Sequence, residues 1–298
     1  MIDAGTIVNR TATVKGHAPE PGACRKNRLD APSGREFDWE GVVNQVGQAQ
    51  IAPVTVARDL KVSDLGAALA AGWGDFKAYP GFGLFFAAIY VAAGIFLYYA
   101  LVSWGEVAWL VPAAAGFPLL APFAAVGLYE VSRRRETGQP MSWRSILGAL
   151  RGRGDEQLLS MGVIVFVAFG FWLMLAHGIF AIFLAESGIG GESLELFRTG
   201  AGIMMLLVGG VVGALMALAF YSITVVSLPM LVDRDVDFIT AIIVSLATMR
   251  SNTLVMLIWA ILIAASLFVA MLPLFLGLLV VLPVLGHATW HLYRRAVT

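Results

Sequence analysis

The sequence predicts an all-α polytopic membrane protein with six transmembrane helices, and three observations lead to this fold class. Of the 298 residues, 59% are hydrophobic and only 13% are charged, whereas an ordinary soluble domain has roughly 25% charged residues. The charged residues gather before residue 80 and in three short stretches after it, with long apolar runs between them. In addition, all but one of the basic residues fall on a single side of the expected bundle.

Residues 1–60 form the first element, which we expect to be a poorly ordered cytoplasmic tail. The stretch has no sustained apolar period and carries Pro19, Pro21, Pro32 and Pro53 among turn-forming residues. It also lacks the apolar core of a secretory signal. The single cysteine, Cys24, excludes an intrachain disulfide and a cysteine-based metal cluster. Residues 61–298 form the predicted transmembrane domain.

Six apolar stretches follow, each long enough to cross a hydrocarbon core of about 30 Å. The second contains Pro112, Pro118 and Pro122, which interrupt its helical hydrogen bonding, so it either lines a binding site or packs as a kink. The last two are divided at Pro273 by a tight hairpin, with one kinked helix as the alternative. The expected spans are 81–103, 107–129, 159–185, 200–231, 254–272 and 274–293.

Counting basic residues on each side of the six spans predicts the orientation. On the side of the two termini lie 19 of the 20 Lys and Arg residues, and only Arg198 falls on the other side. Because cytoplasmic loops carry the excess of Lys and Arg, both termini are expected in the cytoplasm.

Amphipathic helices at the cytoplasmic interface are expected ahead of the first, third and fifth spans. Each of these segments opens with a polar residue suited to helix capping, namely Ser63, Ser142 and Asp237. Each reaches a span about 18 residues later, as in a threefold repeat of an interfacial helix and a helical hairpin. The alternative is that any cytoplasmic connector has this amphipathic character.

Titratable residues within the spans are the first place to look for function, because burying one in a membrane is costly. Only His177 lies deep in an expected span. His287 and His291 are spaced i, i+4 and share one helical face, so they are weak candidates for metal or haem ligands. A polar anchor at the inner interface is the preferred interpretation, and no metal or other cofactor is expected.

Two charged segments next to the membrane are candidates for interactions. Arg133, Arg134 and Arg135 follow the second span, where they either anchor the topology or dock a partner. The segment from Asp233 to Asp237 contains Asp233, Arg234, Asp235 and Asp237. We expect its carboxylates to form salt bridges with the arginine cluster and so to clamp two inner loops together.

The sequence contains no nucleophile elbow, phosphate-binding loop or zinc motif, so no enzymatic activity is expected. A formal net charge of zero argues against a nucleic-acid partner. The scarcity of intramembrane carboxylates and histidines argues against an ion-coupled pump or antiporter.

Three strings carry a resemblance to a known family: APFAAVGLYEVSRRRETG (121–138), LPMLVDRDVDFITAI (228–242) and LFLGLLVVLPVLGHATWHLYRR (274–295). Over about residues 55–298 the chain resembles a bacterial family of predicted integral membrane proteins with a domain of unknown function. Some members are labelled cytochrome c oxidase subunit-like. The label implies proximity to respiratory enzymes, although the chain lacks the several intramembrane histidines that bind haem and copper in a catalytic oxidase subunit.

Two functions agree with these observations. The first is a non-enzymatic inner-membrane protein that acts through contacts with lipid and other membrane proteins, as an accessory or assembly factor of a respiratory complex. The alternative is a passive transporter or channel for a neutral or apolar solute, which would use the broken second span.

Overall fold

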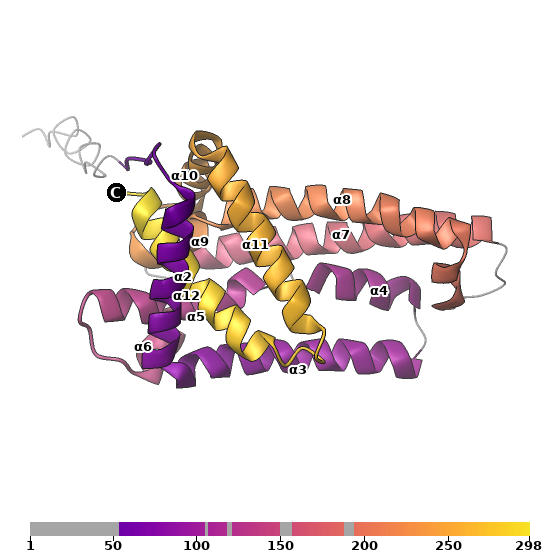
Figure 1. The fold of residues 1–298 in the computed structure, drawn as a ribbon, viewed down its shortest axis with the longest axis horizontal. Helices are drawn as coiled ribbons and strands as arrows, with labels where there is room; N and C mark the ends of the chain where they lie inside the picture. The colour runs from indigo at the N-terminus through magenta and orange to yellow at the C-terminus, as the bar shows by residue number, and fades with distance from the viewer. Residues whose placement is uncertain (1–53, 105–106, 118–120, 150–156, 188–193) are drawn as a thin grey trace, which may run out of the picture. The chain divides into compact units, whose positions relative to one another are not determined.

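The computed structural model describes residues 54–104, 107–117, 121–149, 157–187 and 194–298, and Figure 1 shows the arrangement of their helices. Residues 1–53, with most of the predicted tail and Cys24, lie outside the described residues. The described chain is helical apart from one isolated antiparallel bridge between Val56 and Val297. The predicted all-helical class is therefore confirmed.

Four candidate membrane-spanning helices are present in the described residues. They are long and apolar because their sequences run 18 residues or more with almost no charge. They comprise α3 (Pro80–Trp104), α7 (Gln157–Ser187), α8 (Gly200–Thr224) continued by α9 (Ser227–Asp233), and α11 (Thr253–Met271). A short 3₁₀ helix, η3 (Leu194–Arg198), precedes α8. By length and composition, four of the six expected spans are thus present as single helices among the described residues.

The expected second span is two helices, α4 (Val107–Gly116) and α5 (Ala121–Glu136). Side chains from neighbouring helices satisfy backbone carbonyls near the break: the Trp172 indole donates to the carbonyl of Pro112 at 3.0 Å, and the Tyr90 hydroxyl donates to that of Phe117 at 2.5 Å. Because a carbonyl without a partner is costly in a bilayer, these two bonds make the interruption tolerable. Neither α4 nor α5 is long enough to cross the membrane by itself.

The last stretch contains two helices, because α11 ends at Met271 and α12 (Leu278–Ala296) begins after a tight turn. Leu274 and Phe275 adopt positive φ angles of 49° and 66° in this turn, a conformation that costs a non-glycine residue about 1–2 kcal/mol. The Phe275 ring packs edge-on against Phe117 with centroids 6.3 Å apart. The second half of α12 carries His287, His291 and two arginines, which explains why α12 is not among the candidate spans.

Three helices precede α3, α7 and α11, and their lengths do not support the threefold repeat. α2 (Val62–Ala78) has 17 residues, α6 (Trp143–Gly148) has 6 and α10 (Phe238–Ser251) has 14. Ser142 and Asp237 cap α6 and α10 by accepting backbone hydrogen bonds, as expected. Ser63 does not cap α2: the N-cap is Lys61, and Asp64 accepts the bond from its backbone N–H at 2.9 Å.

Helix α12 lies in the main core and contacts α2, α3, α5 and α11. In Figure 1, α2 runs across the ends of the long helices rather than parallel to them. It approaches α12 closely at Gly72, where an added Cβ would lie 2.5 Å from the backbone nitrogen of Ala288. This contact brings the polar face of α2 against α5 and α12.

Candidate functional site

A buried polar cluster joins α2, α5 and α12 at the end of the molecule that carries the arginines of α5 and α12. Asp75 from α2 lies at its centre and is 3% exposed. Its Oδ2 accepts hydrogen bonds from the Ser132 hydroxyl at 2.5 Å and from His291 Nε2 at 2.8 Å, while its Oδ1 pairs with Arg135. Ser132 also contacts His287 Nδ1 at 2.7 Å. One carboxylate therefore connects three helices.

The hydrogen bonds determine the proton positions in this cluster. Because Ser132 donates its one proton to Asp75, it must accept a proton from His287 Nδ1. Burial raises the pKa of Asp75, but hydrogen bonds from His291 and Ser132 lower it more, and the pKa falls from 3.8 to about 2. Asp75 is thus ionised at neutral pH, and it holds α2 against its neighbours.

This arrangement does not resemble a nucleophilic triad, in which the histidine accepts the serine proton. Here the serine proton goes to a carboxylate, and the serine is 1% exposed. The two candidate histidines lie on the face of α12 toward α2 and α5, where His287 Nδ1 and His291 Nε2 make hydrogen bonds, while the buried His287 Nε2 has no partner among the described residues. The described residues contain no group of three or more His, Cys, Asp or Glu side chains that could hold a metal ion. The hydrogen bonds of the cluster hold α2, α5 and α12 together.

The arginine cluster lies in the last turn of α5 rather than in a loop, and its pairing differs from the expectation. Arg133 and Arg134 both bind the buried carboxylate of Glu130, at 2.7 and 2.6 Å, and Arg135 binds Asp75. The expected salt bridges to Asp233, Asp235 and Asp237 were wrong, since none occurs among the described residues. The physical reason is helical spacing, which places Glu130 one turn before the arginines.

Two of the aspartates expected to bind the arginine cluster, Asp233 and Asp237, make other contacts instead. Asp233, at the end of α9, pairs with Arg294 at 3.1 Å and with its neighbour Arg234 at 3.8 Å, and it accepts the Tyr293 hydroxyl bond at 2.8 Å. Asp237 caps α10, and its hydrogen bonds with Thr240 lower its pKa. These contacts of Asp233 join α9 to α12. The described structure gives Asp235 no ion pair.

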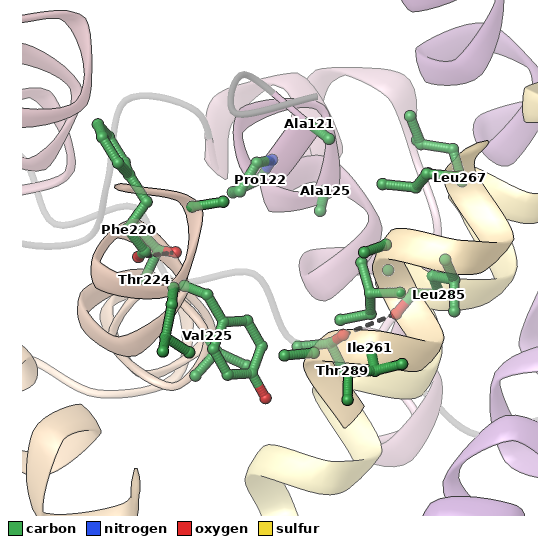
Figure 2. A pocket seen from close by; sticks show the side chains of 18 of the residues that line it. Ala121, Pro122, Ala125, Phe220, Thr224, Val225, Ile261, Leu267, Leu285 and Thr289 are labelled. Atoms are coloured by element: carbon green, nitrogen blue, oxygen red, sulfur yellow. Dashed lines mark hydrogen bonds between the residues drawn. The ribbon is translucent and has the colours of Figure 1, made fainter. Parts of the chain in front are cut away.

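An apolar cavity of about 440 Å³ lies between α5, α8, α11 and α12. Figure 2 shows side chains from these helices around it, with Pro122 and Ala125 opposite Leu285 and Thr289. Its lining contains no charged side chain. The lining residues are Ala121, Pro122, Ala125, Tyr129, Ala214, Ala217, Leu218, Phe220, Tyr221, Thr224, Val225, Leu257, Ala260, Ile261, Ile263, Ala264, Leu267, Leu282, Leu285, Gly286 and Thr289.

The cavity exists because all four helices present small residues to it. Two alanines each come from α5, α8 and α11, and Gly286 comes from α12. Leucines at these positions would fill the space, as they do in a close-packed core. The first turn of α5, immediately after the break in the expected second span, supplies Ala121 and Pro122. The break therefore borders a cavity whose volume of about 440 Å³ falls within the 300–1,000 Å³ typical of ligand pockets.

Residues 110–233 match the family described as "Predicted integral membrane protein (DUF2189)". The family resemblance is confirmed over these residues. This match and the four candidate spans make the protein a multi-pass integral membrane protein in contact with the lipid bilayer. No curated protein and no solved structure is significantly similar to the chain.

The DUF2189 match includes the first of the three strings that carried the resemblance and ends within the second. It runs from α4 to the end of α9, and so it supplies the α5 and α8 walls of the cavity. The α11 and α12 walls lie beyond it. The polar cluster is divided likewise: Ser132 and Arg135 lie inside the match, and Asp75, His287 and His291 lie outside.

Sequence reasoning missed Asp75, Ser132 and Glu130. For Glu130 a signal was present, because Arg133 and Arg134 follow it at i+3 and i+4. Asp75 and Ser132 are 57 positions apart in the chain, and only the tertiary structure shows that they meet. His177, the one histidine deep in an expected span, lies in α7 and takes no part in the cluster.

Proposed function

We propose that this multi-pass membrane protein is a passive carrier that binds a neutral or apolar molecule in the cavity between α5, α8, α11 and α12. The observation that carries the proposal is the chemistry of the lining, which is apolar except for four hydroxyl-bearing residues. A charged solute would lose its hydration there without gaining a partner, whereas an apolar one gains about 25 cal/mol for each Å² that it buries. The proposed role requires no enzymatic step.

Exposed alanines on two walls suggest how a molecule would enter. Ala217 of α8 and Ala264 of α11 both line the cavity and are both exposed in the isolated chain. In a bilayer these positions meet lipid tails, so an apolar molecule would reach the cavity from the membrane without passing a polar barrier.

The test uses substitutions that fill the cavity. In phosphatidylcholine vesicles, a long-chain alkane carrying a photoreactive diazirine should label cavity-lining peptides of the wild type. Ala217→Phe and Ala264→Phe should reduce this labelling severalfold. The matched controls, Ala219→Phe and Ala265→Phe, alter exposed alanines of the same helices that do not line the cavity, and they should leave labelling unchanged. Equal labelling in filled and control variants would refute the proposal.

The proposal keeps six crossings in a bacterial inner membrane, with α4 and α5 together forming one and α12 another, and both termini in the cytoplasm. The distribution of basic residues, 19 of 20 on one side, supports this orientation. Cys24, the single cysteine, allows a direct check. A membrane-impermeant maleimide should label it only after the cells are permeabilised, and labelling of intact spheroplasts would contradict the orientation.

The role of an accessory or assembly factor of a respiratory complex stays a prediction, because no contact among the described residues points to such a partner. Native pull-down in mild detergent checks it. Recovery of respiratory subunits at a fixed ratio to this chain would support the role, and their absence would count against it.

A further inference from the structure

We infer that the occupant of the cavity is one acyl chain of a glycerolipid, held with its ester group at the end of the cavity that lies nearest the polar cluster. The inference rests on the proposed function, because it names the class of molecule that the same cavity binds. Three observations carry it: the placement of the hydroxyl groups, the free donor among them and the length of the cavity.

The hydroxyl-bearing residues of the lining all lie toward one end. Helices α5, α8 and α12 run in the direction of the arginines and the polar cluster, and Tyr129, Thr224 and Thr289 lie in their later turns. The earlier turns contribute Pro122 and Leu282, which are apolar. In Figure 2, Thr289 lies across the pocket from Ala121 and Pro122, and Thr224 lies beside Phe220 on the α8 wall. The cavity therefore has one polar end and one apolar end.

One hydroxyl at the polar end is available to a ligand. Thr224 donates to the carbonyl of Phe220 at 2.7 Å, Thr289 to that of Leu285 at 2.8 Å, and Tyr221 to that of Met256 at 2.8 Å. Tyr129 lines the cavity, is 4% exposed, and its hydroxyl makes no hydrogen bond with the described residues. The Tyr129 oxygen is not among the fully buried polar atoms without a partner, so it keeps some surface that an acceptor in the cavity can reach. An uncharged acceptor, such as an ester carbonyl, would be the partner of this hydroxyl.

The length of the cavity matches the hydrocarbon thickness of one membrane leaflet. Its wall along α8 extends from Ala214 to the C-cap Val225, and the 11 steps between these residues rise about 16 Å at 1.5 Å per residue. A leaflet contributes half of the roughly 30 Å hydrocarbon core, or about 15 Å. Pro122 lies seven residues before Tyr129 on α5, or about 10 Å, so an acyl chain of about 15 Å whose ester lies at Tyr129 would run past Pro122 and extend toward Leu267. A molecule that was apolar along its whole length would leave the Tyr129 donor unpaired.

The experiment locates the two ends of a bound chain. Two phosphatidylcholines, one with a diazirine close to the glycerol and one with a diazirine at the chain terminus, are incorporated into vesicles with the full-length protein. After irradiation, the first should label peptides around Tyr129 and Thr289, and the second should label peptides around Pro122 and Leu267. Ala217→Phe should remove both sets of labels, and the exposed control Ala219→Phe should remove neither.

Tyr129→Phe tests the polar contact. Loss of one hydrogen bond should lower specific labelling of the cavity by about 2- to 10-fold. The exposed α3 residue Tyr98, which does not line the cavity, provides the control Tyr98→Phe with no change expected.

The outcomes separate this inference from the proposed function. If both lipids label the two ends equally, or in reversed order, while the alkane still labels the cavity, the oriented acyl chain is refuted and the proposed function stands. If neither lipid nor alkane labels the cavity above the Ala217→Phe variant, both are refuted. Crosslinks from the cavity walls to a second protein chain in place of lipid would also overturn the inference.

Discussion

Gly72→Ala tests how closely α2 must approach α12. An alanine Cβ would lie 2.5 Å from the nitrogen of Ala288 and 2.7 Å from the carbonyl oxygen of Val284. Both are backbone atoms and cannot rotate away. Ordinary contact begins near 3.4 Å, so the helices must separate by about 0.9 Å. Such overpacking costs about 1–3 kcal/mol, which the better helix propensity of alanine offsets by up to about 1 kcal/mol.

The matched control is Gly66→Ala in the same helix, where an added Cβ meets nothing within 4 Å. This change should stabilise the protein by about 0.5–1 kcal/mol, because glycine is the poorer helix former. Thermal unfolding followed by circular dichroism in detergent should therefore shift in opposite directions for the two variants. Midpoints that move together, or a Gly72→Ala midpoint at or above the wild type, would refute the packing argument.

Separation of α2 from α12 should also weaken the hydrogen bond between Asp75 and His291, because Asp75 lies one turn after Gly72. In a double-mutant cycle, Gly72→Ala should cost less in an Asp75→Asn background than in the wild type. Additive effects would show that the glycine contact and the polar cluster are independent.

Three further predictions follow from the polar contacts. The pKa of Asp75 is about 2 in the folded protein, against an ordinary value of 3.8. The ionised carboxylate therefore contributes its full stabilisation above about pH 4, and this contribution is lost as the pH falls toward 2. The acid-induced drop in melting temperature should be smaller in Asp75→Asn than in the wild type, and an equal drop would contradict this prediction. Trp172→Phe removes the donor to the Pro112 carbonyl and should destabilise the protein by about 1–3 kcal/mol in thermal unfolding, and an unchanged midpoint would argue that this carbonyl needs no partner. Arg134→Asp should lower the melting temperature, and adding Asp235→Arg should not raise it again, because the carboxylate that Arg134 binds lies on its own helix. Recovery of the melting temperature in the double variant would instead support a salt bridge between Arg134 and Asp235.

The apolar runs predicted the membrane-spanning helices well because length and lack of charge are properties of the sequence itself. Helix α3 differs from the expected first span by a single residue at each end, 80–104 against 81–103. The three prolines likewise indicated the break between α4 and α5. The side chains that satisfy the break, Tyr90 and Trp172, come from other helices, and no local pattern points to them.

The polar contacts were predicted poorly because a carboxylate near an arginine in sequence competes with one near it in space. Charge complementarity suggested Asp233 and Asp235 as partners of the arginine cluster. Glu130 had the advantage of helical spacing, and Asp75 had the advantage of the close contact that Gly72 allows. The cavity could not be predicted from the sequence either, since small residues on four separate helices must face one another to form it.

The contacts between the first and last described segments have a consequence for biosynthesis. Val56 pairs with Val297, the N–H of Thr55 donates to the carbonyl of Thr298 at 3.0 Å, and α2 packs along α12. The ribosome makes α2 more than 200 residues before its binding surface. The amphipathic helix must therefore wait at the surface of the membrane, with its carboxylate hydrated, until the final hairpin has been inserted. Docking of α2 must thus follow the synthesis of α12, and a nascent chain stalled before α12 would leave this helix without its binding surface.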